Sequence, residues 1–72
     1  MTNTELLKQR IEESGLKYGF IAEKLGLSRF GLKKKIDNDS SFKAEEIQKM
    51  CEVLFLTLEE REEIFFASNV GK

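Results

Sequence analysis

The sequence predicts an all-α fold: a compact bundle of five helices in one domain that spans residues 1–72. Apolar residues recur three and four positions apart in five successive segments, which is the spacing of one face of a helix. Glycine or small polar residues separate these segments, and no useful stretch alternates apolar and polar residues as a strand would. A chain of 72 residues can bury one small hydrophobic core.

The first helix is predicted at residues 3–14. Thr2 and Glu5 fit a capping box, in which the hydroxyl accepts from an early backbone amide and the carboxylate accepts from the amide of the capping residue. Gly15 stands where a helix commonly ends in a left-handed conformation. The residues expected to face the core are Leu6, Leu7 and Ile11.

The second and third helices are predicted at residues 17–25 and 28–37, with only a short turn between them. Gly26 supplies the left-handed residue that ends the second helix, and Ser28 can cap the third. Ala22 is small enough to let the two helices approach closely where they cross. The apolar residues expected between them and the core are Ile21, Ala22, Leu25, Leu27, Leu32 and Ile36.

The fourth and fifth helices are predicted at residues 44–55 and 58–67, after a loop of Asp, Asn and Ser residues. Thr57 and Glu60 form a second capping box at the start of the fifth helix. The apolar positions of these two helices are Ile47, Met50, Cys51, Leu54, Leu58, Ile64 and Phe65.

The composition argues against catalysis. With no histidine the chain lacks the usual general base and imidazole ligand, and its single cysteine can form neither an intrachain disulfide nor a thiolate metal cage. We therefore expect no enzyme, no cofactor, no metal and no small-molecule substrate. No apolar run approaches the ~18–20 residues of a membrane span, and no signal peptide is visible, so we expect a cytoplasmic protein with no membrane partner.

The net charge of −1 conceals a strongly uneven distribution. Residues 17–36 carry six basic side chains and one acidic side chain, whereas residues 37–72 carry four basic and nine acidic ones. A segment of +5 is thus followed by a segment of −5. This pattern predicts a basic face that coincides with the second and third helices.

Residues 18–37 meet the physical requirements of a helix-turn-helix: two short helices, a glycine-containing turn, a small residue at the crossing and apolar side chains between them. With helices on both sides, residues 4–66 resemble the Cro/CI-type repressor domain, also called lambda-repressor-like. The sequence Ala-Glu-Lys-Leu-Gly-Leu-Ser at residues 22–28 is the most typical stretch. The resemblance implies a transcriptional regulator in the genetic switch of a phage or prophage, associated with the nucleoid of a bacterial host when bound to DNA.

In such domains the second helix of the motif lies in the major groove of double-stranded operator DNA, with its first side chains reading bases. The resemblance implies base reading by Arg29, Phe30, Lys33 and Lys34. It implies contacts to the DNA backbone by Lys17, Tyr18, Lys24, Ser28 and Lys35. Domains of this family read palindromic operators as symmetric pairs, so a homodimer is also implied.

The sequence leaves an alternative open. Asp37 and Asp39 place two acids just after the basic helix, and they would oppose binding to phosphate. In its length and acidic second half the chain also resembles the modulator-of-repression proteins of temperate phages. That resemblance implies an antirepressor, which binds the DNA-binding domain of a CI-type phage repressor directly and has little DNA affinity of its own.

A protein partner would be held by the acidic segment or by apolar side chains outside the core. The candidates for an apolar partner surface are Phe30, Leu32, Ile36, Phe55, Phe65, Phe66 and Val70. The C-terminal members of this set would equally well close the core or form a homodimer seam. A third interpretation is a structural or assembly module, in which the lysines form a solvated face and bind neither DNA nor a regulator.

Overall fold

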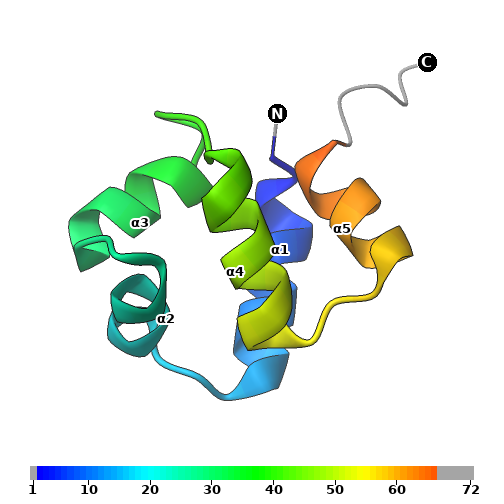
Figure 1. Ribbon diagram of the computed structural model, residues 1–72, viewed down its shortest axis with the longest axis horizontal. Helices are drawn as coiled ribbons and strands as arrows, with labels where there is room; N and C mark the ends of the chain where they lie inside the picture. Colours follow the sequence, from blue (N-terminus) through cyan, green and yellow to red (C-terminus); the bar gives the residue numbers. More distant parts are fainter. Residues whose placement is uncertain (1, 67–72) are drawn as a thin grey trace.

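Five α-helices make up most of residues 2–66, the part of the chain that the computed structural model describes (Figure 1). No strand occurs among these residues, so the predicted all-α fold is confirmed. In chain order the helices are α1 (Thr4–Ser14), α2 (Tyr18–Leu25), α3 (Arg29–Ile36), α4 (Ala44–Leu54) and α5 (Leu58–Phe65). Each begins and ends within one or two residues of its predicted bounds, and the predicted end of the fifth helix at residue 67 lies outside the described residues.

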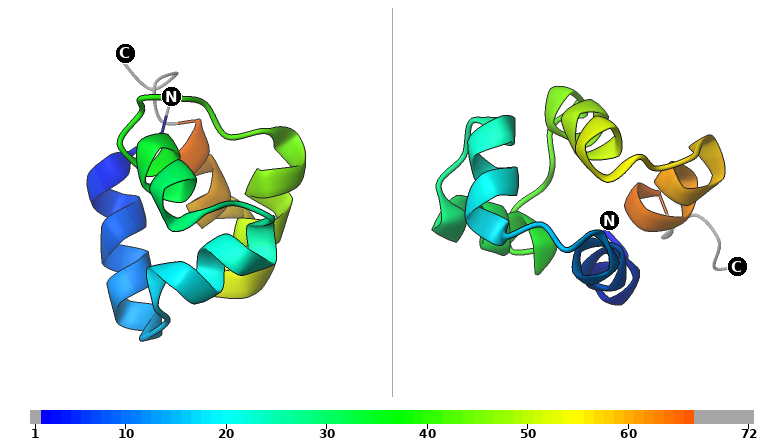
Figure 2. Two further views of the ribbon diagram at one scale, coloured as in Figure 1. Left: turned by 90° about the vertical axis from the view of Figure 1, so that its left-hand side faces the viewer. Right: turned by 90° about the horizontal axis from the view of Figure 1, so that it is seen from below.

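The helices are arranged with α2 and α3 at one end of the molecule and α5 at the other, while α1 and α4 lie between them (Figures 1 and 2). The packing agrees with this view, because α2 and α3 contact one another and α5 contacts α1 and α4. No helix in the described part of the chain has both the length and the hydropathy of a membrane span.

Among residues 2–66, nine apolar side chains from all five helices form the buried core, and helical spacing predicted each of them. They are Leu7, Ile11, Ile21, Ala22, Leu32, Ile36, Met50, Ile64 and Phe65. Leu58 was also expected to face inward, but it is the first residue of α5 and 74% of it is exposed. Phe42, from the polar loop, was missed: its ring packs edge-on against Phe65 with 5.3 Å between centroids.

The helix ends follow the predicted signals with one exception. Gly15 and Gly26 adopt φ of 75° and 76°, and the Gly31 amide donates to Ser28 Oγ over 2.9 Å, as expected for two glycine ends and a serine cap. The predicted capping box at Thr2 and Glu5 is wrong. Asn3 caps α1 instead, because its side-chain oxygen accepts from the Leu6 amide.

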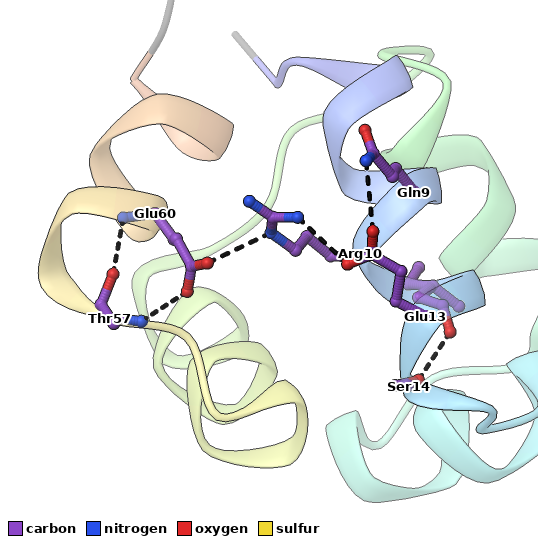
Figure 3. A network of polar contacts seen from close by, with 7 residues as sticks. Gln9, Arg10, Glu13, Ser14, Thr57 and Glu60 are labelled. Atoms are coloured by element: carbon purple, nitrogen blue, oxygen red, sulfur yellow. Dashed lines mark hydrogen bonds and ion pairs between the residues drawn. The ribbon is translucent and has the colours of Figure 1, made fainter.

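A polar network joins α1 to the start of α5 (Figure 3). The capping box of Thr57 and Glu60 is confirmed: the Glu60 amide donates to Thr57 Oγ1 over 3.1 Å, and the Thr57 amide donates to Glu60 Oε1 over 2.9 Å. Arg10 on α1 lies 3.3 Å from Glu60 Oε2 and 3.1 Å from Glu13 Oε1. One guanidinium is therefore shared between two carboxylates from different helices.

Asn38, just after α3, forms hydrogen bonds with the first described residues of the chain. It adopts a left-handed φ of 67°, which asparagine tolerates better than most side chains. Its side chain accepts from the Thr2 amide over 2.9 Å and donates to the Thr2 carbonyl over 2.8 Å. The hydroxyl of Thr4 donates to the Ile36 carbonyl, and the Asn3 amide donates to the Ile64 carbonyl. The start of α1 is thus held by the ends of both α3 and α5.

Candidate nucleic-acid interface

Helices α2 and α3 form a two-helix corner, residues 18–36, joined by a tight turn. The Leu27 amide donates to the Ala22 carbonyl over 2.8 Å, and the Gly26 amide donates to the Glu23 carbonyl over 3.1 Å. Ala22 is 1% exposed, which is consistent with its predicted place at a close helix crossing. The turn therefore fixes the angle between the helices through backbone hydrogen bonds that depend on the left-handed Gly26.

Helix α3 turns a basic face outward. Arg29, Phe30, Lys33 and Lys34 are all exposed. Leu32 and Ile36, on the opposite side of the helix, are buried in the core. Figure 2 (left) shows α3 at the outer surface of this end of the molecule. The structure thus brings together the four residues that the sequence assigned to base reading.

The four exposed side chains of this face form two pairs of neighbours along α3. Arg29 and Lys33, like Phe30 and Lys34, are four residues apart, so each pair shares one side of the helix. Lys34 Nζ lies 5.6 Å from the centroid of the Phe30 ring, a cation–π distance, although Phe30 is 73% exposed. Within residues 2–66, none of Arg29, Lys33 and Lys34 is neutralised by an ion pair.

Helix α2 adds further exposed groups beside α3. Lys17, Tyr18 and Lys24 are exposed, as contacts to a DNA backbone require. Lys24 Nζ lies 5.3 Å from the ring centroid of Phe20, a residue that the sequence analysis did not select and that is 44% exposed. Ser28 is exposed too, and because its oxygen already accepts the cap bond, its hydroxyl hydrogen remains able to donate.

Lys35 does not belong to this surface, and its predicted contact with DNA phosphate is wrong. Only 12% of its side chain is exposed. Its Nζ lies 2.8 Å from Glu46 Oε1 and donates to the Ser41 carbonyl over 3.1 Å. The spacing that turned Leu32 and Ile36 inward also carries Lys35 toward α4, where it has an internal partner.

Glu46 completes this contact at the start of α4. Burial raises the pKa of its carboxyl, but hydrogen bonds from the Lys35 side chain and the Lys43 amide, with the charges of both residues, outweigh burial and lower the pKa below its ordinary value. The Lys43 amide donates to Glu46 Oε1 over 2.8 Å, so the carboxylate also satisfies the backbone amide of the residue that precedes α4. Glu46 is therefore ionised and structural.

The acidic loop after α3 is less opposed to phosphate than its sequence suggests. Asp37 lies 3.5 Å from Lys8 Nζ, which offsets its charge. Asp39 is exposed, and within residues 2–66 it has no ion-pair partner. One of the two predicted opposing charges is thus compensated by α1.

Gly19 leaves room for the side chain of Arg29. A Cβ atom at this position would lie 3.4 Å from Arg29 Cδ, so the arginine stem runs against the backbone of α2. A hollow of about 540 Å³ opens beside it. Its lining residues are Gly15, Leu16, Lys17, Gly19, Phe20 and Arg29. The helix-interior glycine was visible in the sequence, but which side chain it accommodates was not.

Three residues of the predicted apolar partner surface are buried, so their part of that prediction is wrong. Leu32, Ile36 and Phe65 are 0%, 1% and 4% exposed, because the core needs them. Phe66 is half-buried, with the Arg61 guanidinium 5.5 Å from its ring centroid, and Val70 lies outside the described residues. Phe30 and Phe55 remain exposed.

The described residues offer little to a metal or to nucleophilic chemistry. Among residues 2–66, no three His, Cys, Asp or Glu side chains lie together as a metal site requires. Burial raises the pKa of the Cys51 thiol, which makes its reactive thiolate form less accessible.

Comparison of the chain with protein-family models, with curated protein sequences and with solved structures finds no match.

Proposed function

We propose that this protein regulates transcription by binding double-stranded operator DNA, with α2 and α3 acting as a helix-turn-helix. The observation that carries the proposal is the division of α3 into two sides. Its inner side is anchored in the core by Leu32 and Ile36, while its outer side presents only cationic and aromatic groups. A short rigid helix with one basic exposed face fits the major groove in width and in charge.

The first turn of α3 would read bases. Arg29 can donate two parallel hydrogen bonds to guanine O6 and N7, and the exposed ring of Phe30 can contact a thymine methyl group. Lys33 and Lys34 lie one turn further along the same side and extend the contact to neighbouring bases or phosphates. This order places the most geometrically selective side chain at the N-terminal end of the helix.

The exposed groups of α2 and of the turn would hold the sugar-phosphate backbone. Lys17, Lys24 and the hydroxyls of Tyr18 and Ser28 can each meet a phosphate oxygen. Such contacts set the register of the protein on the duplex and make affinity depend on salt, without reading sequence. The resemblance to Cro/CI-type domains supports a place in a phage or prophage switch, and nothing in this mechanism calls for a cofactor.

A gel-shift assay tests the proposal, using duplexes selected from a random library and the promoter DNA that flanks the coding region. We expect K33E/K34E to abolish retention at low salt. The single variants K33E and K34E are each matched by the control K49E, which changes net charge equally at an exposed lysine of α4. Retention that survives K33E/K34E, or that is lost equally in the control, would refute docking through α3.

The acidic surface of α5 favours a second candidate function. Glu59, Glu62 and Glu63 are exposed on this helix, at the end of the molecule away from the basic corner (Figure 1). An anionic helix can pair with the cationic DNA-binding face of a CI-type repressor and compete with operator DNA. Co-elution with the DNA-binding domain of the cognate repressor, without DNA, would support this antirepressor function. Separate elution at micromolar concentration would exclude it.

A further inference from the structure

Phe55 is placed where folding alone would favour a different residue. It ends α4 in a left-handed conformation, with φ 56° and ψ 46°, and its amide donates to the Cys51 carbonyl. Glycine adopts this conformation with no steric cost, whereas a residue with a Cβ is disfavoured. The Phe55 side chain gains little in exchange from its own chain, since 90% of it is exposed. Its exposed aromatic ring is therefore available for contact with another molecule.

The surroundings of Phe55 are anionic. A hollow of about 290 Å³ lies beside it and is lined in part by Arg10, Glu13 and Glu60. Because both carboxylates share the one guanidinium, this network keeps a net negative charge (Figure 3). We call this surface, made of Phe55, Arg10, Glu13 and Glu60, the acidic knob.

The hollow beside Gly19 has the opposite character. Its apolar lining comes from Leu16, Phe20 and the backbone of two glycines, and its charged members are Lys17 and Arg29. No acidic side chain is among the described residues that line it. Neither Lys17 nor Arg29 forms an ion pair within residues 2–66. We call this hollow the basic recess.

The acidic knob and the basic recess lie on the same side of the molecule. Ser14 lines the hollow beside Phe55, and the next residue, Gly15, lines the basic recess. Figure 2 (right) shows this side, to which the C-terminal ends of α1 and α4 are directed. Two copies that meet here about a two-fold axis would each offer a knob to the other's recess. Such a contact closes as a dimer and does not propagate.

We propose that two copies of this chain form a symmetric dimer in which Phe55 of each copy enters the basic recess of the other. The phenyl ring would pack on Leu16 and Phe20, and the acidic border of the knob would face Lys17 and Arg29. This arrangement satisfies apolar packing, charge complementarity and two-fold symmetry at the same time. The two patches are small, so the association is weak, with Kd on the order of 10–100 μM.

The dimer has a consequence that rests on the proposed function. It covers Arg29 and Lys17, which the proposed DNA contact also requires. This dimer therefore does not bind DNA, DNA dissociates it, and it is distinct from the DNA-bound pair that the resemblance to Cro/CI-type domains implies. The association itself does not depend on the proposed function. Each can therefore fail without the other.

Sedimentation velocity from about 5 μM to about 1 mM protein tests the dimer. We expect a shift from monomer to dimer, with no larger species, and a weaker dimer at high salt. F55G removes the knob while suiting the left-handed backbone, and K17E/R29E reverses the charge of the recess. Each variant should weaken dimerisation at least about tenfold. An equimolar mixture of the two variants keeps one intact knob–recess contact and should dimerise more strongly than either variant alone.

The control is F30A, which removes another exposed phenylalanine ring from outside both surfaces and should leave dimerisation unchanged. A monomer at every concentration would overturn the proposal, and so would equal losses in F55G and F30A. Adding the selected duplex separates the two proposals. Dimerisation without DNA binding would leave the dimer and remove the proposed function, whereas DNA binding by an obligate monomer would do the reverse.

Discussion

Lys35 and Glu46 join the end of α3 to the start of α4 across 2.8 Å, with 12% and 10% of their side chains exposed. The position of α3, and so of its outer basic face, depends on this contact as well as on Leu32 and Ile36. The sequence placed Lys35 among the DNA contacts, whereas the structure places it in an ion pair between α3 and α4.

Breaking this pair should destabilise the fold. Glu46→Ala leaves the Lys35 ammonium without its carboxylate and removes the acceptor of the Lys43 amide, so we expect a loss of about 2–3 kcal/mol in the free energy of unfolding. Urea unfolding followed by circular dichroism measures it. Glu45→Ala, at an exposed neighbouring position, is the control and should change stability by less than about 0.5 kcal/mol. Equal effects would mean that the pair contributes nothing specific.

The lowered pKa of Glu46 predicts a pH dependence with a definite sign. A carboxyl whose pKa is lower in the folded state contributes stability above its unfolded pKa, near the ordinary value of 4.5, and loses it as pH falls through the folded value. Thermal melts from neutral pH to about pH 3 should therefore show a steeper loss of Tm in the wild type than in Glu46→Gln. Parallel curves for the two proteins would contradict the ionised role of Glu46.

Gly26 should be the more costly of two glycine substitutions in the α2–α3 corner. Its φ of 76° disfavours any Cβ, so Gly26→Ala should lower stability by about 1 kcal/mol. Gly19→Ala is the contrast: it lies within a helix, and its new Cβ would meet Arg29 Cδ at 3.4 Å, an ordinary contact. Helix propensity should make that variant neutral or more stable by up to about 1 kcal/mol. Thermal unfolding of both variants distinguishes the two outcomes.

We expect the wild type and two variants at Asn38 to differ in stability in a definite order. Asn38→Gly keeps the left-handed backbone but loses the hydrogen bonds to Thr2, and should cost about 1 kcal/mol. Asn38→Ala loses the same bonds and adds backbone strain, so it should cost about 1 kcal/mol more. Chemical denaturation should rank the wild type above the glycine variant and the glycine variant above the alanine variant. Equal stability of glycine and alanine would show that the backbone conformation carries no penalty.

Arg29 and Lys24 should affect DNA binding in different ways if the proposed function holds. Arg29→Ala should relax the preference for one base pair, with a loss of about 1–3 kcal/mol on the best duplex. Lys24→Ala should weaken binding to every duplex equally and make the slope of log K against log salt shallower by about one. Fluorescence anisotropy on matched and mismatched duplexes at several salt concentrations measures both. Uniform weakening by Arg29→Ala would place that residue on the backbone instead.

The fold was predictable from the sequence because its elements are specified locally. Apolar spacing identified all nine core residues, and the helix ends at Gly15, Gly26 and Thr57 depend on residues next to them in the chain. The exception at Thr2 has a different origin. Asn3 is an equally good local cap, and the Thr2 and Asn3 amides donate to Asn38 Oδ1 and to the Ile64 carbonyl, which come from far along the chain.

The surface was harder to predict, because exposure depends on contacts between helices. Lys35 differs from Lys33 and Lys34 only in its direction from the helix axis, and Glu46, eleven residues later, provides its partner. Phe65 and Phe55 are both aromatic, yet one packs against Phe42 in the core and the other projects from a helix end. Neither outcome can be read from composition or from charge along the chain.

The contact between the Asn3 amide and the Ile64 carbonyl brings the first turn of α1 beside the last turn of α5. The first and last described residues therefore lie close together in the fold. A connection that leaves the described residues at either end starts from that place, so its reach is set by its length and not by which end carries it.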